Sequence, residues 1–163
     1  PVDFDKFRKF QIMPSVQPTH ATSDMYWAKD RLGEERMKGA YAYKHLLKEY
    51  GKLALGSDFP VEHFNPMYGF HAAVARVDRK GYPDQGFQMQ DAISREDALR
   101  GMTIWAAYSC FQEKKRGSIE AGKDADFVVL EQDILKIPNE QLRNVKTTRT
   151  VIAGETVFNR QQQ

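Results

Sequence analysis

The run Leu53-Ala54-Leu55-Gly56-Ser57-Asp58 decides the fold class of this chain. Three apolar residues follow the helix-stopping Gly51, and a turn-forming glycine and an acidic residue come soon after them. A short apolar run of this kind is typical of a strand that is covered on both faces, as in a parallel sheet. In parallel α/β folds, functional groups gather beyond the carboxyl ends of the strands. Asp58 is therefore the first candidate for a functional residue.

The rest of the chain divides into a part in which helices and strands alternate and a tail that is mostly strand. Apolar spacing and cap residues predict helices over residues 4–10, 24–32, 34–50, 67–76 and 95–108, strands over residues 12–17 and 53–55, and a polar loop at 18–20. After Gly117, strands are expected at 127–130, 147–152 and 157–158, the last two as a hairpin across Ala153-Gly154. Alternation implies parallel strands with helices outside, and the tail implies a small separate sheet.

Local signals place several of the helix ends. Asn65 before Pro66 is typical of a helix start, because asparagine caps the free amides and proline suits the first helical position. Ser94 and Asp97 resemble a capping box. Gly33 is expected to end the helix that precedes it.

Length and composition fit one ordinary globular domain, or one piece of a larger one. The chain has 163 residues, of which 41% are hydrophobic and 28% charged, and its formal charge of +2 is spread along the sequence. Nucleic acid is therefore not an expected partner, and without an apolar stretch of about 20 residues a membrane is not expected either.

A single cysteine, Cys110, excludes an internal disulfide and favours the cytoplasm. Because the chain starts at Pro1, we expect a truncated chain, and a signal peptide upstream stays open.

Two residues lie where a parallel fold would place chemistry. Asp58 follows one predicted strand, and His20 follows the other by three residues. A carboxylate at such a position can bind a divalent cation or take a proton from metal-bound water, although an aspartate there is also a common turn or cap residue. His20 can be a metal ligand, a hydrogen-bond partner of a substrate or a plain loop histidine. Glu62 and His63 suggest a local metal cluster, but no histidine pair with ligand spacing supports it.

Three runs of sequence stand out in order along the chain: Pro14-Ser15-Val16-Gln17-Pro18-Thr19-His20, Leu55-Gly56-Ser57-Asp58-Phe59-Pro60-Val61-Glu62, and Lys115-Arg116-Gly117-Ser118-Ile119-Glu120-Ala121-Gly122-Lys123-Asp124-Ala125-Asp126-Phe127-Val128-Val129-Leu130. In the same order, these runs resemble the amidohydrolase superfamily, and its third amidohydrolase family in particular. The resemblance implies an α/β fold that is the C-terminal part of a (β/α)₈ TIM barrel. Residues 12–17 and 53–55 would be its seventh and eighth strands, residues 1–116 the partial barrel domain, and residues 117–163 a segment of a small β-sandwich.

The resemblance also implies roles for the two candidate residues. Asp58 would be the eighth-strand aspartate, which contacts the catalytic metal and acts as a base toward the attacking water. His20 would face the substrate rather than the metal. The implied reaction is hydrolysis of a carbon–nitrogen bond in a small amide-like molecule, with a divalent metal, expected to be zinc, in the full-length protein. The stretch 117–130 identifies the family but is expected to be structural.

The chain also departs from the family pattern. It has no counterpart of the first-strand His-x-His pair, of the fourth-strand ligand or of the fifth- and sixth-strand histidines. We therefore expect this fragment alone to bind metal weakly or not at all, to be inactive, and to self-associate through exposed barrel edges. The alternatives are a non-catalytic fragment or half-barrel scaffold, and a parent protein that kept the barrel for binding after losing its ligands.

Overall fold

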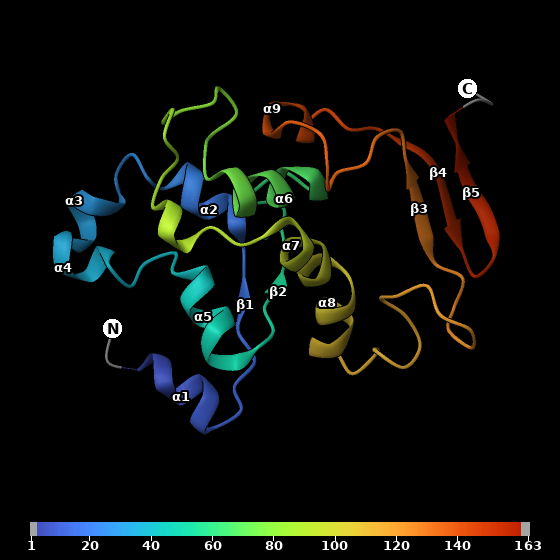
Figure 1. The fold of residues 1–163 in the computed structure, drawn as a ribbon, viewed down its shortest axis with the longest axis horizontal. Helices are drawn as coiled ribbons and strands as arrows, with labels where there is room; N and C mark the ends of the chain where they lie inside the picture. The colour runs from blue at the N-terminus through green and yellow to red at the C-terminus, as the bar shows by residue number, and fades with distance from the viewer. Residues whose placement is uncertain (1–2, 161–163) are drawn as a thin grey trace.

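The computed structural model describes residues 3–160, as a mixed region of helices and two short strands and a separate antiparallel sheet (Figure 1). The elements in chain order are α1 (Phe4–Lys9), β1 (Ser15–Val16), α2 (Pro18–Ser23), α3 (Ala28–Leu32), α4 (Glu34–Met37), α5 (Tyr43–Tyr50), β2 (Ala54–Leu55), α6 (Pro66–Ala75), the 3-10 helix η1 (Met89–Asp91), α7 (Arg95–Met102), α8 (Ile104–Ser109), β3 (Phe127–Leu130), α9 (Asn139–Leu142), β4 (Thr147–Ile152) and β5 (Glu155–Asn159). No helix among the described residues is long and apolar enough to cross a bilayer.

β1 and β2 form a parallel pair, as the sequence predicts. Ser15 pairs with Ala54 and Val16 with Leu55. The strands are shorter than expected, because ladder pairing reaches only two residues in each, and Ile12 at the start of the predicted strand is 48% exposed. The chain between β1 and β2 folds into α2 to α5, which is the helical crossover that parallel strands require.

The core of the molecule lies among α2, α6 and α7, with α7 packed on β2. Leu53, Phe70 and Ala98 are fully buried there. α6 packs against both α2 and α7, so the strands are covered by helices on more than one side (Figure 1). α7 approaches β2 so closely that a Cβ at Gly101 would lie 2.9 Å from the Leu53 carbonyl oxygen. A glycine is therefore required at this contact.

The predicted helix over residues 34–50 is wrong as one element, since it forms α4 and α5 with a break between them. The backbone turns at Tyr41, whose φ is 56°. The Tyr41 carbonyl accepts a hydrogen bond from Nη1 of Arg76 at 3.2 Å, and the Arg76 side chain is fully buried. A contact across 35 residues thus overrides the local helical pattern.

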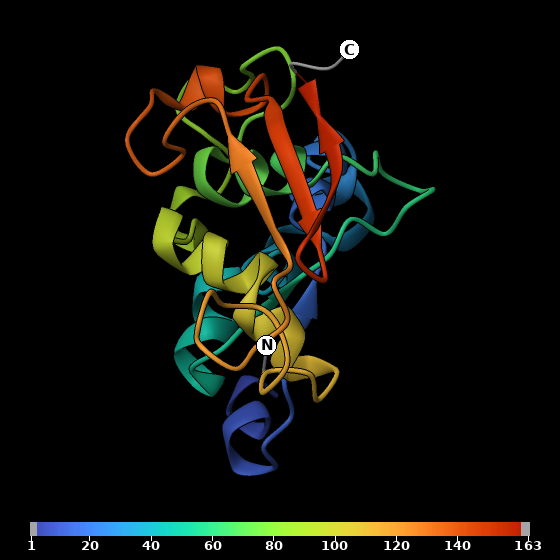
Figure 2. The same ribbon diagram turned by 90° about the vertical axis from the view of Figure 1, so that its right-hand side faces the viewer.

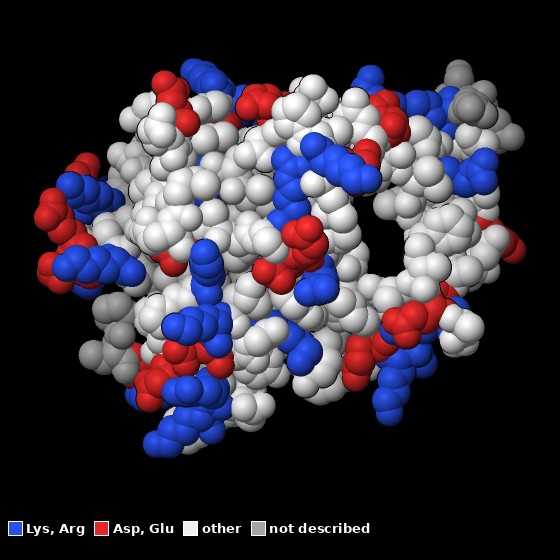
Figure 3. Space-filling model, in the orientation of Figure 1, with Lys and Arg blue, Asp and Glu red and all other residues white. Residues whose placement is uncertain are grey.

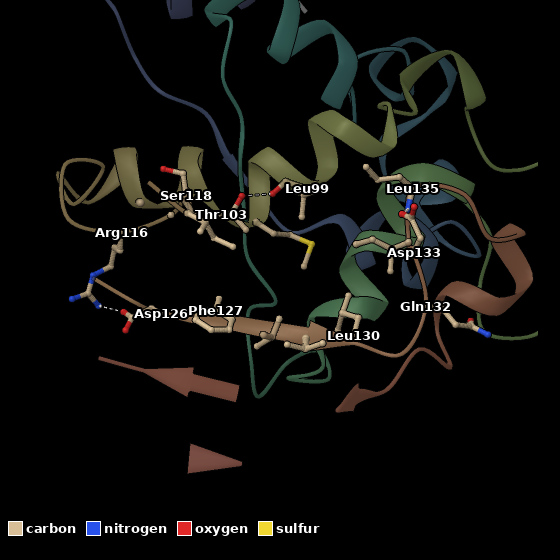
Figure 4. Close-up of a pocket in the computed structure, with 18 of the residues that line it drawn as sticks. Leu99, Thr103, Arg116, Ser118, Asp126, Phe127, Leu130, Gln132, Asp133 and Leu135 are labelled. Atoms are coloured by element: carbon tan, nitrogen blue, oxygen red, sulfur yellow. Dashed lines mark hydrogen bonds and ion pairs between the residues drawn. The ribbon is translucent and has the colours of Figure 1, made fainter. Parts of the chain in front are cut away.

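The predicted helix over residues 95–108 is also interrupted, at Thr103. In a continuous helix the Thr103 amide would donate to the Leu99 carbonyl. That carbonyl instead accepts the Thr103 hydroxyl at 2.6 Å, drawn as a dashed line in Figure 4, and the amide donates to Arg100. A threonine side chain competes with its own backbone here, and the result is two helices, α7 and α8.

Two other expectations about helices have opposite outcomes. The predicted loop at residues 18–20 is wrong, because Pro18 occupies the first position of α2. The predicted start of α6 is confirmed, since the Asn65 side chain accepts from the Met67 amide at 3.0 Å. The Ser94 cap is confirmed in the same way, through the Asp97 amide.

The tail forms one antiparallel sheet of β3, β4 and β5 in that order. The predicted hairpin is confirmed, with φ of 51° at Ala153 and 82° at Gly154, the positive values that a two-residue hairpin turn uses. The short helix α9 between β3 and β4 was not predicted, and its Leu142 is fully buried in the core. That residue anchors the tail to the helical region.

Candidate active site

The structure brings His20 and Asp58 together at one edge of the β1–β2 pair. His20 lies in α2, which begins just after β1, and Asp58 follows β2. Nε2 of His20 lies 3.4 Å from Oδ2 of Asp58. Their approach follows from the strand pairing, because the carboxyl ends of parallel strands meet at the same edge of a sheet.

Asp58 combines a turn in its backbone with a free carboxylate. Its φ is 59°, and its carbonyl accepts from the Val61 amide at 2.8 Å. The Ser57 hydroxyl, which could have held the carboxylate, accepts from the Phe59 amide at 3.2 Å instead. The Asp58 side chain is 49% exposed and turned toward His20. The backbone of Asp58 thus forms a turn, and its carboxylate takes no part in that turn.

The His20 imidazole has an unusual environment for a histidine at the edge of a site. Its Nε2 is shielded from solvent and has no hydrogen-bond partner among residues 3–160, because the approach to Asp58 does not meet hydrogen-bond geometry. The side chain as a whole is 26% exposed. A shielded ring nitrogen beside a carboxylate therefore has an unused hydrogen-bonding position.

The loop that carries Asp58 is tied to the helix that carries His20. The Ser23 hydroxyl at the end of α2 donates to Oε1 of Glu62 at 2.6 Å. Beyond this tie the loop projects from the molecule, as Figure 2 shows for the segment between β2 and α6, and Phe59 and Phe64 are 63% and 67% exposed. The polar contact thus fixes the base of the loop beside His20 while its apolar tip stays open.

Glu62 and His63 do not form the local metal cluster that their closeness to Asp58 suggested. Glu62 is engaged by Ser23, and Nδ1 of His63 accepts from the Asn65 amide at 3.0 Å. The His63 ring also stacks on Phe64, with centroids 4.4 Å apart. Both side chains therefore hold the loop in shape.

The described residues fit one side of a metal site. A carboxylate oxygen and an imidazole nitrogen are donor types that zinc accepts, and Nε2 of His20 has no protein hydrogen bond to lose. A catalytic zinc usually has three protein ligands. Within residues 3–160, no group of three His, Cys, Asp or Glu side chains is placed to hold a metal ion. Asp58 and His20 can thus be members of such a site without completing it.

The other two histidines are structural. His71 in α6 is 3% exposed, and burial lowers its pKa to about 4, with the positive charge of Arg143 acting in the same direction. Its ring is therefore neutral at pH 7. His45 lies in α5, where its ring stacks on Phe4 at a centroid distance of 4.2 Å. Both lie in helices, as predicted.

Sequence reasoning missed a polar cavity beside this edge. Its volume is about 420 Å³, and its walls come from α2, the loop after Asp58, α6 and residues 78–80. Arg143, which follows α9, also lines it, with its guanidinium 3.9 Å from the centre of the Tyr68 ring. No local pattern indicates this cavity, because Arg143 belongs to the tail that was assigned to a separate sheet.

Comparison with known families matches residues 2–158 to the amidohydrolase family. Among curated proteins, YtcJ of Bacillus subtilis (strain 168), provisionally named an amidohydrolase, is 34% identical over 154 residues, which cover 94% of this chain and 29% of the relative. The N-substituted formamide deformylase of Arthrobacter pascens is 30% identical over 127 residues, which cover 78% of this chain and 23% of the relative. This chain therefore spans less than a third of the length of these relatives.

A solved structure shows the same likeness. The crystal structure of an uncharacterized metal-dependent hydrolase from Pyrococcus furiosus has a TM-score of 0.70 and 33% identity, and the match covers 83% of this chain and 26% of that one. The mixed α/β fold described above is thus shared with a metal-dependent hydrolase. Together with the family match over nearly the whole sequence, this likeness shows that the chain belongs to the amidohydrolase family.

Proposed function

We propose that this chain forms the Asp58 side of the active site of a metal-dependent hydrolase that cleaves carbon–nitrogen bonds in small amide-like molecules. One observation carries the proposal, namely the approach of Nε2 of His20 to Oδ2 of Asp58 at 3.4 Å beyond the paired strands β1 and β2. The carboxyl edge of parallel strands is where hydrolases of this architecture hold their catalytic groups.

The proposal includes the larger architecture. β1 and β2 are the seventh and eighth strands of a (β/α)₈ barrel, residues 1–116 are its C-terminal part, and residues 117–163 are a segment of a small β-sandwich. The parallel pairing with a helical crossover and the likeness to a metal-dependent hydrolase support this arrangement. The antiparallel β3–β4–β5 sheet supports the separate tail.

Asp58 acts as a metal ligand and as the base in this proposal. A bound divalent cation, which we propose to be zinc, would lower the pKa of its water to about 7. The Asp58 carboxylate accepts a proton from the attacking water and returns it to the leaving nitrogen. Its exposure of 49% and the absence of a hydrogen bond to Ser57 leave the carboxylate free for this exchange.

His20 binds the substrate in this proposal. Its Nε2 is shielded and unpartnered, so it can donate to or accept from a polar atom of a molecule held against Asp58. The amide-like class of substrate is supported by the name of the Arthrobacter pascens relative, an N-substituted formamide deformylase. The single cysteine supports a cytoplasmic location, which is part of the proposal.

A kinetic comparison in the intact protein that contains this sequence tests the proposal. Asp58→Asn is expected to lower kcat/KM by about 10³-fold, because it removes the proton acceptor. His20→Gln is expected to raise KM while leaving the metal content unchanged. Asp30→Asn, on the exposed face of α3, is the matched control and should keep full activity. An Asp58→Asn protein with normal kcat/KM would exclude the assigned role.

A second function is a non-catalytic half-barrel scaffold. Like the first function, it agrees with the lack of a three-ligand group among residues 3–160. Both functions predict that the 163-residue chain alone neither hydrolyses amides nor holds zinc at one ion per chain. Metal analysis of the purified chain checks this. Stoichiometric zinc that disappears in Asp58→Ala would contradict the partial site.

A further inference from the structure

We propose that the polar cavity between α2, α6 and residues 78–80 binds a small oxyanion, a carboxylate or phosphate group. The cavity has a volume of about 420 Å³. Ser23 of α2 and Glu62 of the loop after Asp58 both line it, so it adjoins the candidate active site. The proposed site needs neither a metal nor the hydrolytic reaction.

The carboxylates that line this cavity already have partners. Oδ2 of Asp78 accepts the Tyr26 hydroxyl at 2.6 Å, and its Oδ1 accepts the amides of Lys80 and Tyr82 at 2.7 and 2.9 Å. Oε1 of Glu62 accepts the Ser23 hydroxyl at 2.6 Å. These donors engage both oxygens of Asp78 and one oxygen of Glu62, so neither acid forms a close ion pair with the cationic side chains of the cavity among residues 3–160.

Within residues 3–160, the cationic side chains that line the cavity form no close ion pair, although the charge of Lys80 acts on Asp78 and lowers its pKa. Arg79, Lys80 and Arg143 all reach it, and none of them forms an ion pair with another residue of the described range 3–160. Arg143 is half-buried over the Tyr68 ring, and within that range its guanidinium N–H groups meet no acceptor, while its backbone amide donates to the Gln141 carbonyl. Stacking on an aromatic ring fixes a guanidinium and leaves its donors for a ligand.

A buried hydroxyl at the same cavity also lacks a partner. Thr19 is 7% exposed and lines the cavity, and its Oγ1 makes no hydrogen bond within the part of the chain that the structure describes. A buried polar atom without a partner costs free energy, so such atoms call for an explanation. Because Thr19 lines the cavity, its hydroxyl is a candidate donor to a molecule held there.

These features favour an oxyanion over other ligands. Three cations against two carboxylates leave an excess of positive charge at the cavity. The planar guanidinium donors of Arg79 and Arg143 match the paired oxygens of a carboxylate or phosphate group. A threonine hydroxyl adds a further donor of the type that such groups accept.

The test is a titration of the 163-residue chain with inorganic phosphate and, separately, with succinate, at constant ionic strength and followed by amide NMR. We expect saturable shifts at residues 78–80 and Thr19 with at least one of the two anions. Whichever anion binds more tightly identifies the source of the oxyanion. Shifts that grow without saturation for both anions would overturn the proposal.

Charge variants decide whether the binding belongs to this cavity. Arg79→Gln/Lys80→Gln is expected to weaken binding by about tenfold or more, since charge-assisted hydrogen bonds are lost. Both side chains are exposed, so the double variant should fold. Lys114→Gln/Lys115→Gln removes the same charge from exposed neighbours outside the cavity and should leave the affinity unchanged. Equal affinities in the first variant and the wild type, or equal losses in both variants, would overturn the assignment.

Discussion

The region around β1 and β2 and the sheet of β3 to β5 expose their apolar residues to very different degrees. Leu53 and Phe70 in the first region are fully buried beneath helices. In the sheet, Val128, Ile152 and Val157 are 55%, 53% and 58% exposed. Figures 1 and 2 show the sheet standing at the side of the helical region rather than within it. The first region therefore carries its own core, while much of the sheet surface remains open.

A hollow between the two regions adds to this difference. Figure 4 shows β3 facing α7 and α8 across a cavity of about 1030 Å³, and Figure 3 shows the same part of the molecule as an opening. Arg116 bridges to Asp126 at 3.7 Å at one end of the hollow. On the face in Figure 3, acidic and basic side chains are mixed, without a continuous basic stripe. We therefore expect substitutions in the two regions to lower the free energy of unfolding by very different amounts.

The largest effect is expected for Phe70→Ala. Removing a fully buried aromatic side chain leaves a cavity in the core among α2, α6 and α7, and we expect a loss of about 4 kcal/mol in the free energy of unfolding. Urea unfolding followed by circular dichroism measures it. Val157→Ala, at the exposed β5 position, is the control and should cost less than about 1 kcal/mol. Similar losses at both positions would remove the distinction between the regions.

A smaller effect is expected from pH, through His71 in the same core. Burial lowers its pKa to about 4, below the value of 6.5 that is usual for histidine, so the unfolded chain binds the proton more readily. The free energy of unfolding therefore has its full value, as far as His71 is concerned, above pH 6.5, and it falls as the pH drops toward 4. We expect a loss on the order of 2 kcal/mol across this window. Unfolding of wild type and His71→Leu at several pH values checks this, and an identical slope in both proteins would contradict it.

The sequence predicts those parts of this architecture that depend on neighbouring residues. The parallel pair, the Asn65 and Ser94 caps and the Ala153-Gly154 turn all follow from local patterns, and the structure confirms them. The breaks at Tyr41 and Thr103 do not follow, because one depends on the distant Arg76 and the other on a side chain displacing a helical hydrogen bond.

The candidate site shows the same limit. Strand order predicts that groups after β1 and β2 share an edge, and His20 and Asp58 do approach each other there. The polar cavity could not be predicted, because Arg143 reaches it from beyond α9, a helix that the sequence pattern missed. Local sequence patterns do not predict tertiary contacts between segments that are far apart in the chain.

Two threonines of α2 are both buried, but only one of their hydroxyls makes a hydrogen bond within residues 3–160. Thr19→Val removes a hydroxyl that has no partner among the described residues 3–160 and is expected to raise the free energy of unfolding by about 1 kcal/mol. Thr22→Val is the matched control, because its hydroxyl donates to the Thr19 carbonyl at 3.0 Å, and it should lower stability by about 1 kcal/mol. Thermal unfolding of both variants measures the difference. A destabilised Thr19→Val would show that its hydroxyl has a partner in solution.

The smallest effect is expected for Val157→Thr, and it reports on the open face of the sheet. Threonine keeps the β-branched shape that strands favour, and the position is 58% exposed, so the change should stay within about 0.5 kcal/mol. Val151→Thr in the neighbouring strand β4, at 6% exposure, places the same hydroxyl inside the protein and should cost about 1–3 kcal/mol. Urea unfolding at two protein concentrations compares them. A Val157→Thr cost that rises with concentration would mean that copies of the chain cover this face in solution, and the contrast with the buried β1–β2 region would then hold only for the monomer.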